Sequence, residues 1–273
     1  SSWGGNIQLG ANSTFDVGAG DTLIVGGVVS GGYNLTKVGA GTLSLNGENT
    51  YSGGTTIGAG MVKLGHNAGL GTAAASIASG AALDLNGKSI ANALSVSGTG
   101  IGSGGAITNS DSNNEATLGG AITLVADSSW VTAGAIKTTA KVDGAKALTV
   151  TGTGGLTLAA GVGQSTALTS VNISVPLTLG ADITTSGTQT YAGAVTLSGG
   201  DRTLSGSTVH TQGTLAGGGN ALTITGDADI DGAYSGLTSL SISGAANFGA
   251  NITTSGTQTY AGAVTLSGGD RTL

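Results

Sequence analysis

The residues best placed by type and spacing to hold a metal ion are aspartates near the end of the chain. They form the pattern D-x-D-x-D-G: Asp227, Asp229, Asp231 and Gly232. This pattern is the first half of a calcium-binding loop, but the acidic ligand expected at its twelfth position is replaced by Thr238. If the segment is a strand, the carboxylates simply face water while Ala228 and Ile230 point inward. Mutual repulsion of the carboxylates keeps a weak calcium site open as a hypothesis.

Catalytic chemistry has little support in the sequence. Polysaccharide lyases and hydrolases need clustered carboxylates, whereas the acidic residues here are dispersed. His66 and His210 lie far apart and have no metal-ligand spacing. A catalytic site is expected to occur once, whereas Asp201-Arg202 recurs as Asp270-Arg271. We therefore interpret this pair as part of a repeated surface corner. We therefore predict no enzymatic activity and no cofactor. Polysaccharide binding or degradation stays open as a second alternative function.

Two polar patterns are candidates for surface contacts. Tyr51, Tyr191 and Tyr260 share a Thr-Tyr-x-Gly frame, and exposed tyrosines on a flat β-face are typical contacts for carbohydrate or another fibre. In the alternative interpretation, each ring covers a corner glycine of the neighbouring coil. Thr-x-Thr pairs also recur, at Thr188 and Thr190, Thr223 and Thr225, and Thr257 and Thr259. Stacked threonines indicate an alternative function in binding ice or a crystal surface, although threonine is also an ordinary outward strand residue.

The elements that must position these side chains are short β-strands. Aliphatic residues alternate with polar ones in many runs, such as residues 42–45, 148–151 and 240–243. Gly, Asn, Asp and Ser interrupt the runs every few residues, and no sustained helical period is present. We therefore expect an all-β protein with almost no helix.

The composition excludes several classes of protein. Glycine occupies 54 of 273 positions, yet it is not at every third position and there is one proline, which excludes collagen. Aliphatic residues recur throughout, unlike in disordered chains. No run of eighteen apolar residues exists, so no membrane insertion is expected. The net charge of −6 and the absence of a basic run exclude nucleic-acid binding.

A long repeat organises the second half of the chain. Residues 183–204 and 252–273 are identical, at an offset of 69 residues, which divides into three coils, or rungs, of about 23 residues. We therefore predict a right-handed parallel β-helix of about 23-residue rungs, with tandem β-sandwich domains as the runner-up. The expected parts are residues 1–117 and 118–273 of one continuous solenoid, and Leu273 is expected to cut through a rung.

The N-terminal part carries a more specific motif. Residues 39–60 read Gly-Ala-Gly-Thr-Leu, then Asn-Thr-Tyr-Ser-Gly-Gly-Thr, then a second Gly-Ala-Gly. Over residues 35–64 the sequence resembles the passenger-associated transport repeat of bacterial autotransporter adhesins. The later repeats resemble, more by composition, filamentous-haemagglutinin-type β-helical exoproteins.

The resemblance implies a structural and adhesive stalk, secreted or displayed on the outer cell surface, with the signal and anchor outside this chain. Its implied partners are other copies of itself, surface proteins or glycans. Exposed β-surface and open rung ends favour self-association on physical grounds as well.

Overall fold

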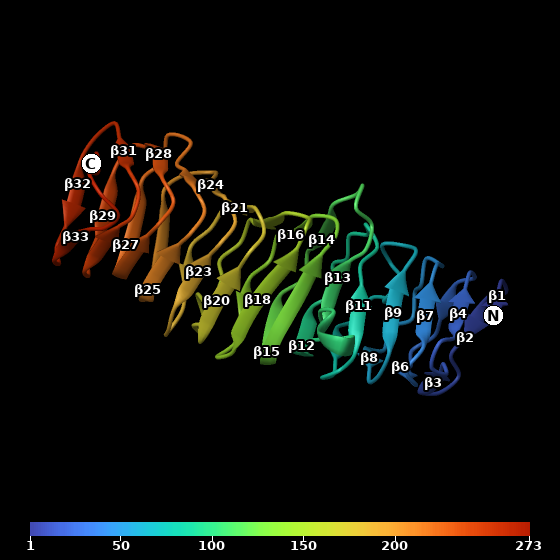
Figure 1. Ribbon diagram of the computed structural model, residues 1–273. Helices are drawn as coiled ribbons and strands as arrows, with labels where there is room; N and C mark the ends of the chain where they lie inside the picture. The colour runs from blue at the N-terminus through green and yellow to red at the C-terminus, as the bar shows by residue number, and fades with distance from the viewer. The chain divides into compact units, whose positions relative to one another are not determined.

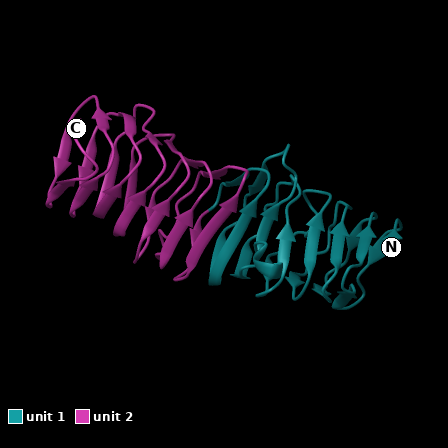
Figure 2. Cartoon of the chain, in the orientation of Figure 1, with its two compact units in different colours: residues 1–140 teal, residues 141–273 magenta.

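The computed structural model describes residues 1–273 and consists almost wholly of short β-strands (Figure 1). Its one helical element is a single 3₁₀ turn, η1 (Ile101–Ser103), so the expected near-absence of helix is confirmed. The chain forms two compact units, residues 1–140 and residues 141–273 (Figure 2). No helix is both long and apolar enough to span a membrane.

The strands of the first unit are β1 (Ser2–Trp3), β2 (Ile7–Gln8), β3 (Ser13–Asp16), β4 (Thr22–Val25), β5 (Val29–Ser30), β6 (Leu35–Val38), β7 (Thr42–Leu45), β8 (Thr55–Ile57), β9 (Met61–Leu64), β10 (Ala75–Ile77), β11 (Ala82–Asp84), β12 (Leu94–Gly98), β13 (Ile107–Asn109), β14 (Ala116–Leu118), β15 (Ile122–Thr132) and β16 (Ile136–Thr138). Those of the second unit are β17 (Val142–Asp143), β18 (Ala147–Gly152), β19 (Leu156–Leu158), β20 (Ser170–Ile173), β21 (Leu177–Leu179), β22 (Ile183–Thr184), β23 (Gln189–Tyr191), β24 (Val195–Leu197), β25 (Arg202–Thr211), β26 (Leu215–Ala216), β27 (Leu222–Ile230), β28 (Tyr234–Leu237), β29 (Leu240–Ile242), β30 (Ala246–Phe248), β31 (Ile252–Thr254), β32 (Gln258–Tyr260) and β33 (Val264–Leu266).

Within each unit the strands pair in parallel with strands one rung away. In the first unit β6 pairs with β8 and β7 pairs with β9, and in the second unit β21 pairs with β24 and β24 with β26. A strand in the middle of such a stack makes backbone hydrogen bonds to the rungs on both sides. The predicted parallel β-solenoid is confirmed, and the runner-up is wrong because β-sandwiches are built from antiparallel strands.

Most rungs are somewhat shorter than the length expected from the repeat. Leu35 pairs with Thr55 on the next rung, and Val171 pairs with Gln189. The rung that separates Leu94 from its partner Ile122 is much longer, because the corner after β12 contains the η1 turn. Rung length is therefore set by the corners, while the strands keep their register.

The second unit has three faces, which we name by their strands. Face I contains β22, the first half of β25 and of β27, then β29 and β32. Face II contains β18, β20, β23, the second half of β25 and of β27, then β30 and β33. Face III contains β19, β21, β24, β26, β28 and β31.

The two identical segments lie on different faces of this unit. Val195–Leu197 belongs to face III, whereas its copy Val264–Leu266 belongs to face II. Likewise Ile183 lies on face I and its copy Ile252 on face III. Each rung contains one strand from each of the three faces. The copy therefore lies one face short of four full rungs after the original segment. The expected division of this offset into three equal rungs is therefore wrong.

Small aliphatic side chains fill the interior, as the alternating pattern predicts. On face I, Leu204, Ile224 and Ile242 lie in register on successive rungs, and each is at most 1% exposed. Because all three faces bury side chains at alternate positions, most of them aliphatic, a copied segment fits on any of them. This interchangeability explains how an exact duplication lands one face away from its original.

Candidate functional site

The three aspartates of the predicted calcium pattern lie along and just after β27, and they do not all converge. As expected, Ala228 and Ile230 point inward, while the aspartates point outward. The Asp227 Oδ1 atom accepts a hydrogen bond from the Ala245 backbone N–H at 2.8 Å, which fixes the corner of the next rung. Asp227 is thus a backbone-capping residue, apart from the other two carboxylates.

The other two aspartates lie close to His210, a residue to which no role was assigned from the sequence. His210 lies in β25 directly opposite Asp229. Its Nε2 atom is 2.9 Å from Asp231 Oδ2 and 3.6 Å from Asp229 Oδ2. The Asp229 Oδ1 atom accepts a hydrogen bond from the Asn247 side-chain amide at 2.9 Å, from the following rung. Sequence spacing did not reveal this cluster because its members lie on successive rungs and meet only through the register.

The prediction that Tyr51 is a surface contact is wrong, because its side chain is fully buried. Its hydroxyl is 2.5 Å from Thr55 Oγ1, which in turn donates to the Leu70 carbonyl at 3.1 Å. A side chain at Gly71 would lie 2.8 Å from the Tyr51 ring, so the ring covers this glycine of the next rung, as the alternative interpretation predicts. Burial raises the pKa of the Tyr51 hydroxyl to about 12.

Tyr191 is also buried, and the prediction that it is a surface contact is wrong as well. Its hydroxyl donates to Gln189 Oε1 at 2.7 Å, and the Gln189 amide donates to the Ser205 carbonyl at 2.7 Å. Burial raises the pKa of Tyr191 well above its usual value. Its copy, Tyr260, makes the same bond to Gln258 and packs against Phe248, with ring centroids 5.2 Å apart. Tyr260 is half-buried, so it alone of the three keeps an accessible edge.

A buried lysine connects the two Gly-Ala-Gly corners of residues 39–60. Lys37 is fully buried, and its Nζ donates to the carbonyls of Val38, Gly39 and Ala59 at 2.7, 2.8 and 3.1 Å. Gly60 has a φ of +65°, and a side chain there would clash with the Gly41 carbonyl oxygen. These motif residues therefore hold adjacent rungs together.

Hydroxyl side chains form a column along the outside of the first unit. The members, one from each of six successive rungs, are Thr14, Thr36, Thr56, Ser76, Ser95 and Thr123. We call this set the hydroxyl column. The outward neighbours in the next row are Asp16, Val38, Gly58 and Ala78, so the hydroxyls stand in single file.

On face I of the second unit, hydroxyl residues form two parallel columns. Thr203 and Ser205 precede Thr223 and Thr225 in register, followed by Ser241 and Ser243. The two-column pattern expected of an ice-binding face thus spans three rungs. Ice binding stays a prediction with this small patch as its basis.

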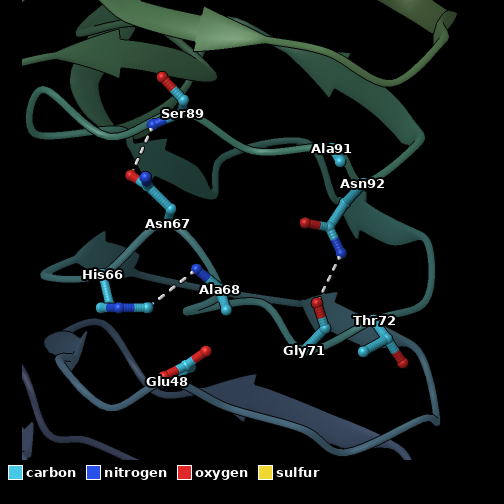
Figure 3. Close-up of a pocket in the computed structure, with 9 residues that line it drawn as sticks. All are labelled: Glu48, His66, Asn67, Ala68, Gly71, Thr72, Ser89, Ala91 and Asn92. Atoms are coloured by element: carbon cyan, nitrogen blue, oxygen red, sulfur yellow. Dashed lines mark hydrogen bonds between the residues drawn. The ribbon is translucent and has the colours of Figure 1, made fainter.

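An open groove of about 490 Å³ lies on the first unit, in the corners between β7 and β12 (Figure 3). His66 Nδ1 accepts a hydrogen bond from the Ala68 N–H at 3.1 Å, which leaves Nε2 to carry the proton of the neutral ring. Asn67 Oδ1 accepts from the Ser89 N–H at 3.0 Å. Asn92 donates to the Gly71 carbonyl at 3.1 Å, and its amide oxygen points into the groove. Glu48 adds one exposed carboxylate.

The groove has the polar groups of a binding site for a hydroxylated ligand. It offers acceptors at Glu48 and Asn92, and a donor at His66. Glycoside hydrolysis uses two carboxylates that flank the bond, whereas Glu48 is the one acid among the residues that line this groove. The groove was not predicted from the sequence, where His66 was considered only as a metal ligand, because its residues meet through three successive corners.

Comparison with known protein families identifies a repeat in the first unit. The passenger-associated-transport-repeat family matches residues 35–64. The chain carries an autotransporter passenger repeat. The resemblance of residues 35–64 to this repeat is thereby confirmed, and the repeat corresponds to β6, β7, β8 and β9, the paired strands of two successive rungs.

The chain is also similar to the Adhesin BmaC autotransporter of Brucella suis biovar 1 (strain 1330), with 37% identity over 106 residues. The aligned segment covers 38% of this chain and 3% of that protein, so the chain corresponds to a very small part of it. No solved structure matches the chain significantly.

Proposed function

We propose that this chain is a segment of the passenger stalk of an autotransporter adhesin, displayed on the cell surface or secreted. Its work is mechanical: stacked rungs carry an outer surface that adheres to other surfaces or to copies of itself. The autotransporter passenger repeat carries this proposal, because its residues serve stacking. Lys37 and Tyr51 are buried in rung contacts, and Asn49 links the Val29 N–H to the Gly69 carbonyl.

The outer hydroxyl column is the proposed contact surface of the first unit. Flat β-surface with evenly spaced hydroxyl groups supports many weak hydrogen bonds to a partner surface. Many such contacts along a stalk act together, so that weak individual contacts give strong adhesion. The proposal assigns no chemical turnover to the chain.

Display of this chain on bacterial cells through a heterologous outer-membrane anchor is expected to increase cell aggregation or adherence over the anchor alone. A variant with three glutamates spread along the hydroxyl column is expected to lose most of that increase: Thr14→Glu, Thr56→Glu and Ser95→Glu. The substitutions remove three hydroxyl groups, and the added negative charges make adjacent copies of the chain repel one another. Sedimentation of the cells and their retention on coated surfaces measure both effects.

A matched control carries three glutamates at exposed threonines outside the column, Thr22→Glu, Thr50→Glu and Thr139→Glu. It is expected to behave like the unchanged chain. Aggregation and adherence no greater than those of the anchor alone would contradict the adhesive role. Equal loss in the column variant and the control would assign the effect to charge in general.

The groove at Glu48 favours glycan binding as a second candidate function. Its separated acceptors and donor suit a polyol, and Glu48→Gln keeps the shape while removing the charge. Displayed cells carrying Glu48→Gln are expected to lose adherence to glycan-coated surfaces while still aggregating with one another. Unchanged adherence to every glycan surface would remove this candidate.

A further inference from the structure

We propose that His210, Asp229 and Asp231 form a binding site for a divalent transition-metal ion such as zinc. The three donor atoms, His210 Nε2 and one carboxylate oxygen from each aspartate, all lie within 4.8 Å of one another. Donor atoms around a tetrahedral zinc ion, with bonds of about 2.1 Å, are about 3.4 Å apart. The two distances from Nε2, 2.9 and 3.6 Å, lie on either side of that value.

Three successive rungs hold the donors in place. His210 belongs to β25, Asp229 to β27 opposite it, and Asn247 to β30 beyond that. The hydrogen bond from the Asn247 amide occupies Asp229 Oδ1 and leaves Oδ2 turned toward the imidazole. This is the outer-sphere arrangement that orients metal-binding carboxylates. Buried Ala228 and Ile230 anchor the strand beneath the two aspartates.

The charge of the cluster favours a cation. Asp229 and Asp231 are two positions apart on the same side of the chain, and the His210 imidazole is the side chain that lies close to both carboxylates. Like charges so placed on a sheet repel each other. A divalent cation bound between them removes this repulsion and joins two rungs.

The donor set selects the kind of ion. Calcium takes six to eight oxygen ligands, whereas one imidazole nitrogen and two carboxylate oxygens suit zinc and its neighbours in the first transition row. The first aspartate of the calcium pattern, Asp227, is engaged with the Ala245 N–H and does not belong to the cluster. The side chains of His210, Asp229 and Asp231 are 26%, 38% and 51% exposed, so the remaining coordination positions face water.

Calorimetric titration of the chain without a polyhistidine tag tests this proposal. One equivalent of zinc is expected to bind per chain, and calcium at about 1 mM is expected not to compete. His210→Gln and Asp229→Asn are each expected to weaken zinc binding by at least about tenfold. Two matched controls, Asp227→Asn on the same strand and His66→Gln, the other histidine, are expected to bind zinc as the unchanged chain does.

A measurement on the unchanged chain covers the case in which a variant fails to fold. Cobalt(II) is expected to shift and broaden the ring proton signals of one histidine, His210, and to leave those of His66 unaffected. Zinc binding that survives His210→Gln, equal displacement by calcium, or cobalt effects confined to His66 would each overturn the proposal.

Discussion

Replacing Trp130 with alanine is expected to lower the free energy of unfolding of the first unit by about 3–5 kcal/mol. Trp130 is the largest of the fully buried side chains. It lies in β15 opposite Ile107 of β13, and its side chain is fully buried. The surrounding rungs are fixed by backbone hydrogen bonds and collapse only partly into the cavity, which makes the cost high. Urea unfolding followed by circular dichroism measures it.

The other tryptophan provides the control. Trp3 is 56% exposed, so Trp3→Ala is expected to change the unfolding free energy of the same unit by no more than about 0.5 kcal/mol. Equal effects of the two substitutions would contradict the assigned register of β13 and β15. A small effect of Trp130→Ala alone would show that the interior of the first unit is loosely packed.

Replacing Lys37 with methionine is expected to cost about 3 kcal/mol of folding free energy, because the carbonyls of Val38, Gly39 and Ala59 lose their shared donor. Methionine has a similar length and no charge, so the change removes the three hydrogen bonds and the charge while largely keeping the side-chain volume. The free energy of unfolding from urea titration measures the effect. Lys137→Met, at a partly exposed position in β16, is the control and is expected to be nearly neutral.

A second effect of Lys37 acts in the opposite direction. Burial lowers the pKa of the Lys37 ammonium, and the Asp16 carboxylate opposes that shift. A lysine whose pKa is lower in the folded chain costs folding free energy while it is charged, and the cost disappears as the pH rises toward 10.5. The three carbonyl bonds must outweigh this cost at neutral pH. A methionine variant more stable than the unchanged chain would show that they do not.

The general architecture followed from the sequence because alternation and glycine punctuation are local signals. Runs such as residues 240–243 were expected to place Leu240 and Ile242 inward, and both are buried. Outward placement of the aspartates around Ala228 and Ile230 was predicted on the same basis. The autotransporter passenger repeat was recognised because its glycine corners and its Asn-Thr-Tyr segment are unusual together.

The rung length could not be obtained in this way. Dividing the repeat into three equal rungs assumes that a copied segment returns to the same face. The structure shows that Ile183 and Ile252 occupy different faces, because all three faces accept the same small aliphatic side chains. The length of a rung depends on how many residues each corner contains, and glycine-rich corners of several lengths look alike in sequence.

The sites were predicted less well than the fold, for two physical reasons. In Gln189-Thr190-Tyr191 no aliphatic residue marks the inward side, so the sequence left open whether the tyrosine packs inside or lies on the surface. His210 and Asp229 are distant in the sequence, and only the observed register makes them neighbours. The Glu48 groove likewise depends on corners from three rungs.

Disulfide trapping tests most directly whether the strands stack in parallel with the short rungs described above. The chain has no cysteine, so introduced pairs report without interference. Thr178 and Thr196 are register partners on adjacent rungs, and both point outward. Adjacent rungs are about 4.8 Å apart, a separation that suits a disulfide.

Under mild oxidation Thr178→Cys with Thr196→Cys is expected to form the bond. The control pair, Thr178→Cys with Asp201→Cys, has the spacing of the longer rung that the repeat suggested, and it is expected to stay reduced. Gel mobility with and without reductant, followed by peptide mapping, measures both. Bond formation in the second pair, or in neither, would contradict the parallel stack described here.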